Sequence, residues 1–167
     1  MQITQFQINA ARTEIDLTIE DAATTTTLTL FKEDTFRDYT LAVDLSSLLG
    51  VGATQNITIT LADINETEFD GVYYIEAQDP DEIRFGITAD LTRYKECILE
   101  DTVALALCDS CFEKKSLKLT NAQHLLRGLQ DAVDTGFYRE AFNLVGALDK
   151  FCSNDCKTCG TYSNVSL

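Results

Sequence analysis

Apolar and polar residues alternate along much of the first ninety positions of the chain. Ile15, Leu17 and Ile19 are each separated by one polar residue, and the segments "TLTLF", "YTLAVDL", "NITITL" and "EIRFGIT" repeat this period. Alternation with a period of two predicts β-strands that bury one face. The segments "GVYYIEA" and "ITQFQI" extend the set to six or seven strands, which turn-forming segments such as "EDAATT" and "QDPDE" separate.

After residue 90 the apolar residues recur every three or four positions, which is the period of a helix. This pattern predicts three helices, in the segments "ADLTRYKECILEDTVALALCDSCFEKK", "KLTNAQHLLRGLQDAVDTG" and "FYREAFNLVGALDKFC". Gly136 has the position of the glycine that ends the second helix. The predicted links between the helices are short, so we expect neighbouring helices to be antiparallel.

These patterns together predict an α+β protein with two parts. We expect an antiparallel β-sandwich domain over residues 1–90, because two sheets can bury Ile and Leu side chains between them and leave Thr, Asp and Glu outside. We expect a helical subdomain over residues 91–167, in which three helices run up, down and up and lead into a cysteine-rich tail. A chain of 167 residues with 45% hydrophobic content can bury such a core.

Acidic residues are concentrated in the predicted sandwich. Residues 1–90 contain 17 Asp and Glu against 4 Lys and Arg, a balance of −13, whereas residues 91–167 contain 10 against 9, a balance of −1. An acidic surface repels phosphate backbones, so we expect no nucleic-acid partner. The charge favours solubility, and it alternatively offers a docking surface to a basic protein.

The sequence contains no segment with the roughly 20 apolar residues that a membrane helix needs. Its first residues, "MQITQFQINAARTEID", lack the basic and apolar regions of a signal peptide. We therefore expect a soluble protein that is made in a cytoplasm and has no membrane partner.

The six cysteines fall mainly into two groups. Cys108 and Cys111 form one C-x-x-C pair, and the tail holds Cys152, Cys156 and Cys159. An up-down-up order of helices brings the end of the first helix and the end of the third to the same pole of the bundle. We therefore expect these five thiols to meet there, and we expect Cys97, three turns earlier in the first helix, to lie apart from them.

Three interpretations of the grouped cysteines remain open. The first is a structural zinc site, because zinc prefers four thiolates in a closed tetrahedron. Its ligands are the two C-x-x-C pairs, Cys108, Cys111, Cys156 and Cys159, with Cys152 as an alternative ligand. The second is disulfide pairing between the first helix and the tail, for example through Cys108 or Cys111, which requires an oxidising environment after assembly or export. The third is a set of buried free thiols.

The sequence contains no residue set typical of an enzyme active site. Reactive C-x-x-C motifs lie at helix N-termini, where the helix dipole favours thiolate, whereas we expect Cys108 and Cys111 near a helix C-terminus. His124 is the only histidine, and we expect it to pack, partly buried, beside the leucine stripe of the second helix. No nucleophile elbow, Walker loop or dinucleotide-binding glycine motif occurs. We therefore predict a protein without catalytic residues or an organic cofactor.

Two stretches carry a resemblance to known proteins. "FDGVYYIEA" followed by "ADLTRYKECILE" couples a strand to a long helix, and "GFYREAFNLVGALDKFCSNDCKTC" joins a helical hairpin to a cysteine tail. Together they resemble small virion proteins of tailed bacteriophages, especially those of crAss-like phages. The resemblance implies a non-enzymatic structural subunit of the portal, neck, tail or capsid. Such a subunit forms rings through repeated protein–protein contacts, assembles in the host cytoplasm, and has portal, adjacent ring or tail subunits as partners.

Two other functions are compatible with the sequence. One is a β-sandwich binding module of the adhesin or carbohydrate-recognition type, for which exposed aromatic residues in loops would be the evidence. Phe69, Tyr73 and Tyr74 are the candidates, although we expect them to pack inside the sandwich. The other is a small zinc-binding interaction protein, which the paired C-x-x-C motifs favour.

Overall fold

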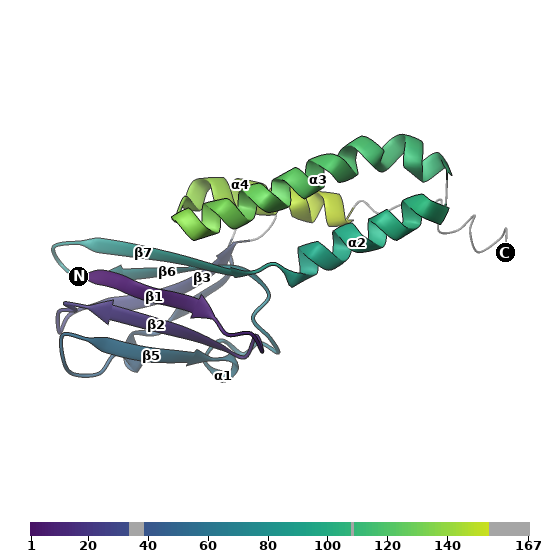
Figure 1. Cartoon of the computed structure of the whole chain (residues 1–167). Coiled ribbons are helices and arrows are strands. Elements are labelled where there is room, and N and C mark those ends of the chain that lie inside the picture. Colours follow the sequence, from purple (N-terminus) through teal and green to yellow (C-terminus); the bar gives the residue numbers. More distant parts are fainter. Residues whose placement is uncertain (34–38, 108, 154–167) are drawn as a thin grey trace.

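The computed structural model describes residues 1–33, 39–107 and 109–153; residues 33, 39–40, 100–107, 109–120, 150 and 153 are described by their backbone alone. Seven antiparallel strands occupy the N-terminal part and helices follow them, which confirms the predicted α+β fold (Figure 1). The strands are β1 (Gln2–Ile8), β2 (Glu14–Glu20), β3 (Thr27–Glu33), β4 (Tyr39–Asp44), β5 (Gln55–Thr60), β6 (Gly71–Gln78) and β7 (Ile83–Asp90). The helices are η1 (Ser46–Leu48), α1 (Leu61–Ile64), α2 (Thr92–Leu107), α3 (Asp109–Thr135) and α4 (Tyr138–Ser153).

The strands form two sheets that face each other. The first sheet has the order β1-β2-β5 and the second has the order β4-β3-β6-β7. The alternating residues of β2, Ile15, Leu17 and Ile19, are buried between the sheets as predicted. They join a core that also contains Leu28, Leu30, Ile57, Ile59, Phe69, Tyr73, Ile75 and Ala77. The period-two pattern therefore identified the inner face of the sandwich.

The two sheets meet along one side, where β1 lies beside β7 (Figure 1). The backbone N–H of Ile8 donates a hydrogen bond to Thr88 Oγ1 at 3.3 Å across this seam. Gly86 makes the close approach possible, because a Cβ at this position would lie 2.9 Å from Ile75 Cγ2 and 3.2 Å from Phe6 Cδ2. Both distances are shorter than ordinary carbon contacts.

Helices α3 and α4 pack against the outer face of β6 and β7, and α2 packs against these two helices. Their shared core contains Val72 and Ile87 from the strands and Leu91, Tyr94, Ile98, Leu129, Val145 and Leu148 from the connecting segment and the helices. An aromatic cluster extends this contact: the ring centroid of Tyr74 lies 5.3 Å from that of Phe85, 5.2 Å from that of Tyr138 and 5.5 Å from that of Phe142. Aromatic pairs at such separations add to the stabilisation from burial.

One predicted helix boundary is wrong and another is confirmed. We expected the first helix to extend through "CDSCFEKK", but α2 ends at Leu107 and α3 begins at Asp109. Gly136 ends α3 as predicted, with a φ of 77° that glycine adopts without strain. None of the helices in the described ranges has the length and apolarity to cross a membrane.

Candidate functional site

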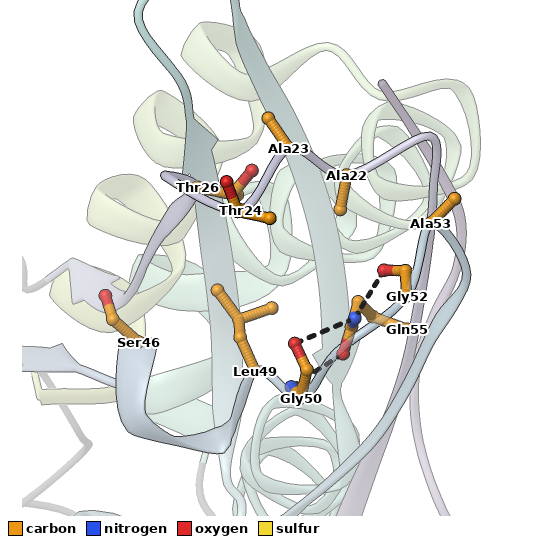
Figure 2. A pocket seen from close by; sticks show the side chains of 10 residues that line it. All are labelled: Ala22, Ala23, Thr24, Thr26, Ser46, Leu49, Gly50, Gly52, Ala53 and Gln55. Carbon is orange, nitrogen blue, oxygen red and sulfur yellow. Dashed lines mark hydrogen bonds between the residues drawn. The ribbon is translucent and has the colours of Figure 1, made fainter.

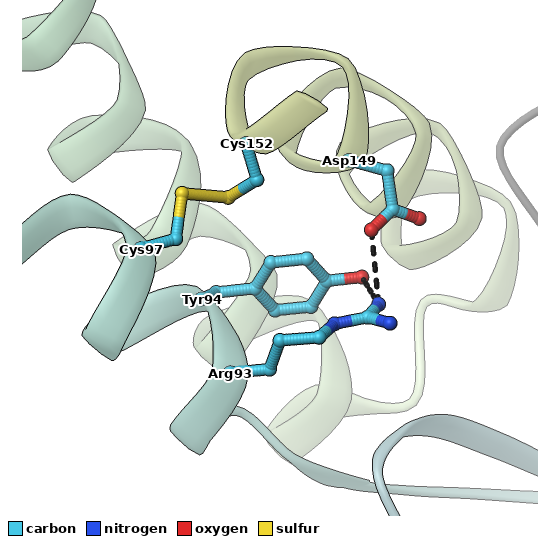
Figure 3. Close-up of a disulfide and its surroundings, with 5 residues drawn as sticks. All are labelled: Arg93, Tyr94, Cys97, Asp149 and Cys152. Carbon is cyan, nitrogen blue, oxygen red and sulfur yellow. Dashed lines mark hydrogen bonds and ion pairs between the residues drawn. A yellow bond between two sulfur atoms is a disulfide. The ribbon is translucent and has the colours of Figure 1, made fainter. Parts of the chain in front are cut away.

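A group of charged and phenolic residues lies where the sandwich meets the helices. We call Lys32, Asp70, Arg93, Tyr94 and Asp149 the polar junction. They come from β3, the residue that precedes β6, α2 and α4. Arg93 Nη2 donates to Asp149 Oδ1 at 2.9 Å and to the Tyr94 hydroxyl at 2.8 Å (Figure 3). Arg93 Nη1 also forms an ion pair with Asp70 Oδ2 at 3.6 Å. One guanidinium therefore links three separate elements of the chain.

Burial changes the proton affinity of several junction groups. Burial raises the pKa of the Asp149 carboxyl above its usual 3.8, and the positive charge of Arg93 opposes part of this rise. Burial also lowers the pKa of Lys32, although the nearby Asp70 favours its charged form. The pKa of Tyr94 is raised by burial. Tyr94 is fully buried and the Asp149 side chain is 15% exposed, whereas the Arg93 side chain is 45% exposed, so the junction is only partly shielded from water.

A disulfide between Cys97 and Cys152 closes the same region. Their Cα atoms lie 5.8 Å apart, and the bond joins α2 to the last turn of α4 across 55 residues of sequence. Cys97 lies one turn after Tyr94, and Cys152 lies one turn after Asp149, so the disulfide sits directly beside the polar junction (Figure 3). The ion pairs and the covalent bond therefore fasten the same two helices at neighbouring turns.

The prediction that Cys97 lies apart from the other cysteines is wrong. The prediction requires α4 to be as long as α3, so that α4 returns to the end of α2. However, α3 has 27 residues and α4 has only 16. The 11-residue difference (27 − 16) leaves the end of α4 about 16 Å short of the junction between α2 and α3. Cys97 lies 11 residues before Cys108 in sequence (108 − 97), so α4 ends beside Cys97.

The proposed zinc ligands fall mostly outside the described residues. Cys108, Cys156 and Cys159 lie outside them, and only the backbone of Cys111 is described. Cys152, the alternative ligand, is instead joined to Cys97. The four-cysteine site of Cys108, Cys111, Cys156 and Cys159 therefore stays a prediction.

The two cysteines of the C-x-x-C pair do not both lie near a helix C-terminus. We placed both of its cysteines near a helix C-terminus, but Cys111 lies in the first turn of α3. The helix dipole at an N-terminus favours thiolate instead of opposing it. The dipole is therefore no argument against reactivity at Cys111.

The histidine and the aromatic residues that the sequence singled out differ in how deeply they are buried. His124 is exposed on α3, so the prediction that it is partly buried is wrong. Phe69 and Tyr73 are fully buried in the sandwich core as expected. The prediction that Tyr74 packs inside the sandwich is wrong, because its ring lies on the outer face of β6 against Tyr138 and Phe142. Burial raises the pKa of Tyr73 to about 12.

A small hollow opens at one end of the sandwich, between the loop from β2 to β3 and the loop from η1 to β5 (Figure 2). Its volume is about 330 Å³, and its lining is uncharged: Ala22, Ala23, Thr24, Thr26, Ser46, Leu49, Gly50, Gly52, Ala53 and Gln55. The Gln55 side chain shapes the rim, since its Nε2 donates to the carbonyl oxygens of Gly50 at 3.2 Å and Gly52 at 2.7 Å. Thr26 Oγ1 is buried and has no hydrogen-bond partner among the described residues.

Large apolar side chains are exposed around the start of β7 and the turn between α3 and α4. Ile83, Phe85 and Phe137 keep 43%, 37% and 61% of their surface exposed. Phe137 directly precedes Tyr138, whose hydroxyl donates to the Phe85 carbonyl oxygen at 2.8 Å. We call Ile83, Phe85 and Phe137 the apolar patch. Exposed groups of large apolar residues commonly mark protein–protein contacts.

The outer face of the three-stranded sheet has the opposite character. Glu14, Asp16 and Glu20 project from its central strand β2, and β1, β2 and β5 contain no Lys or Arg. Asp16 is flanked by Gln7 on β1 and by Thr58 on β5. We call this surface the acidic face. The molecule thus presents two dissimilar surfaces on different elements.

No model of a protein family matches the chain, and no curated protein matches it.

Proposed function

We propose that this protein is a non-enzymatic structural subunit of a bacteriophage virion that forms rings or adaptors at the head–tail region. The observation that carries the proposal is the apolar patch of Ile83, Phe85 and Phe137, which leaves large side chains in water. Burying such side chains against a neighbour gains about 25 cal/mol for each Å² of apolar surface removed from water.

A ring requires two different surfaces on each subunit. Head-to-tail contacts that close on themselves give cyclic symmetry, and each contact joins one patch to a dissimilar patch of the next copy. The apolar patch and the acidic face are dissimilar and lie on different elements, the former on β7 and the turn before α4 and the latter on β2. This arrangement supports a head-to-tail assembly.

A ring subunit must also hold its contact surfaces in a fixed relation. The polar junction and the Cys97–Cys152 disulfide fasten α2 to α4, and Arg93 links these helices to Asp70, the residue that precedes β6. The sandwich and the helices are therefore tied at several points. A disulfide also suits a particle that spends time outside a cell.

The virion assignment rests on the resemblance of "FDGVYYIEA", "ADLTRYKECILE" and the cysteine tail to small phage virion proteins. We accordingly propose portal, adjacent ring or tail subunits as partners, and assembly in the host cytoplasm. Nucleic acid is a poor partner for a chain with a net charge of −14.

The assembly proposal is tested by light scattering and negative-stain imaging of the purified protein. Phe137→Asp places a charge in the apolar patch, and we expect it to abolish a ring that the wild-type chain forms. Leu99→Asp is the matched control, because Leu99 is similarly exposed, at 64%, but lies on α2 outside the patch. A wild-type chain that stays monomeric at high concentration, with and without its portal partner, would reject the proposal.

A second candidate function is small-ligand recognition at the hollow beside Gln55. The buried and unpartnered Thr26 Oγ1 favours it, because a buried hydroxyl without a hydrogen bond is costly and a ligand could pair with it. The uncharged lining would suit a neutral, hydroxyl-rich ligand such as a sugar. A glycan array tests this candidate, with Thr26→Val as the control that removes only the hydroxyl.

A further inference from the structure

The strand β5 is the outer strand of the three-stranded sheet and pairs on one side with β2. The pairing covers six consecutive residue pairs, from Glu14↔Thr60 to Ile19↔Gln55, without a register shift. Among the described residues, the backbone of residues 56–59 has hydrogen-bond partners only in β2. Figure 1 shows β5 at the lower border of the sandwich.

The other outer strands carry features that discourage pairing. The ladder between β1 and β2 shifts register between Ile3 and Gln5, and the ladder between β3 and β4 shifts between Lys32 and Glu33. The remaining outer strand, β7, lies beside β1. Natural proteins protect sheet edges with bulges, charges, proline or a covering element.

Within the described ranges, β5 has no bulge, charge or proline of this kind. Its sequence, "QNITIT", contains no charge, proline or glycine, and its Ile and Thr residues favour extended structure. Ile57 and Ile59 point into the core, while Asn56 and Thr58 are exposed. An uncharged edge with an unbroken register offers its N–H and C=O groups to another strand.

The negative charge around the β5 edge favours a basic strand as its partner. Glu14, Asp16 and Glu20 lie on the neighbouring strand β2, and the first 90 residues carry a balance of −13. A second copy of the same edge would bring two acidic faces together, whereas a basic segment would be attracted. A strand added to β5 would lie about 10 Å from β2, which exceeds the Debye length of about 8 Å at physiological salt, so the attraction to the β2 carboxylates should be strongest at low ionic strength.

We propose that the β5 edge binds an extended segment of another protein as a fourth strand of this sheet. The segment would carry Lys or Arg at the alternate positions that face outward, beside Asn56 and Thr58. It would carry aliphatic residues at the positions that continue the core face of Ile57 and Ile59. The edge would accept such a strand whether or not the chain forms rings.

The probe for this proposal is a capped heptapeptide with alternating lysine and valine, compared with its glutamate–valine counterpart. Amide NMR of the labelled full chain is the readout. We expect shift changes concentrated in residues 55–60, slower hydrogen exchange there, and weakening of binding by added salt. The glutamate peptide should bind at least about fivefold more weakly.

Matched variants locate the site. Thr58 and Gln7 both pair with Asp16, from opposite sides of β2, so Thr58→Lys and Gln7→Lys add the same charge beside the same carboxylate. We expect Thr58→Lys to weaken binding of the lysine peptide at least about threefold, and Gln7→Lys to leave it near the wild-type value. Asn56→Lys and Gln5→Lys form a second such pair around Thr18, should Thr58→Lys lose its fold.

Three results would overturn the proposal. The first is equal binding of the two peptides, or no binding of either at millimolar concentration. The second is equal loss of binding in the β5 and β1 variants of a matched pair. The third is a dimer of the wild-type chain that Thr58→Lys dissociates, since that result would assign the edge to a second copy.

Discussion

Cys97 and Cys152 form a disulfide that joins α2 to the last turn of α4, with their Cα atoms 5.8 Å apart. Arg93 and Asp149, one turn away from each cysteine, bind each other at 2.9 Å. The covalent bond and the ion pair thus act on the same helix pair. Removing either one tests how the helical part is held together.

Loss of the disulfide should destabilise the protein considerably. Cross-linking residues 55 positions apart restricts the unfolded chain, which corresponds to about 4 kcal/mol for a loop of this size. We expect the double variant Cys97→Ser, Cys152→Ser to lose about that amount and to melt about 10 °C lower. Denaturant titration measures the change, and peptide mapping without reductant verifies the pairing. Equal stability of the variant and the oxidised wild-type protein would show that the bond contributes nothing.

The ion pair between Arg93 and Asp149 should contribute a smaller amount. The Arg93 side chain is 45% exposed, so solvent screening limits the coupling to about 1 kcal/mol. A double-mutant cycle with Arg93→Met and Asp149→Asn measures this coupling from the free energies of unfolding. Arg84→Met with Glu82→Gln serves as the control, because that pair lies 2.9 Å apart within β7 and its preceding turn and links no helix. Coupling no larger than in the control pair would contradict the proposed role.

Asp149 should give the junction a pH dependence. Burial raises the pKa of its carboxyl above 3.8, so the folded state binds this proton more tightly than the unfolded state does. The resulting stabilisation is present below pH 3.8 and declines as pH rises through the folded-state pKa. The free energy of unfolding of Asp149→Asn, minus that of wild type, should therefore increase between about pH 3 and pH 6. A flat or falling difference in urea titrations across this range would contradict the assignment.

Gly86 should tolerate no side chain at the seam between the sheets. A Cβ there would lie 2.9 Å from Ile75 Cγ2, so Gly86→Ala should destabilise the protein by about 1–3 kcal/mol through overpacking. Gly128→Ala is the control, because its Cβ would lie 3.4 Å from Leu144 Cδ1 and alanine favours the helix by up to about 1 kcal/mol. Thermal melts distinguish the two outcomes, and equal effects would show that the seam is loosely packed.

The predicted zinc site would fasten the cysteine-rich tail to the helices. If Cys108, Cys111, Cys156 and Cys159 bind zinc, elemental analysis of the protein should find one zinc per chain. The double variant Cys156→Ser, Cys159→Ser should then lose the metal, melt at a lower temperature and expose the tail to proteases. Thiol counting distinguishes zinc from disulfides. Zinc-free protein with unchanged protease resistance in the double variant would reject the site.

The sequence predicted the sandwich well because its signal is local. In β2 the burial of Ile15, Leu17 and Ile19 depends only on their spacing. The end of α3 is likewise indicated by one residue, Gly136, whose positive φ suits a helix C-terminus. The pairing of Cys97 with Cys152 instead depends on the relative lengths of α3 and α4, and an error in one boundary near Cys108 changes which cysteines meet.

The candidate surfaces were harder to predict than the strands. Exposure of Phe137 follows from the turn that Gly136 makes, and no spacing rule distinguishes an exposed phenylalanine from a buried one. The open β5 edge depends on the strand order, which places β5 beside β2 instead of β4. The acidic composition predicts an acidic surface, and the strand order places Glu14, Asp16 and Glu20 on the central strand of the three-stranded sheet.

All six cysteines occur at position 97 or later, whereas the described core between the two sheets ends at Ala77. A ribosome makes the chain from its N-terminus, so every residue of that core is synthesised before the first thiol. The sandwich core can therefore fold without an oxidant. The disulfide between the helices can form afterwards, as the last step.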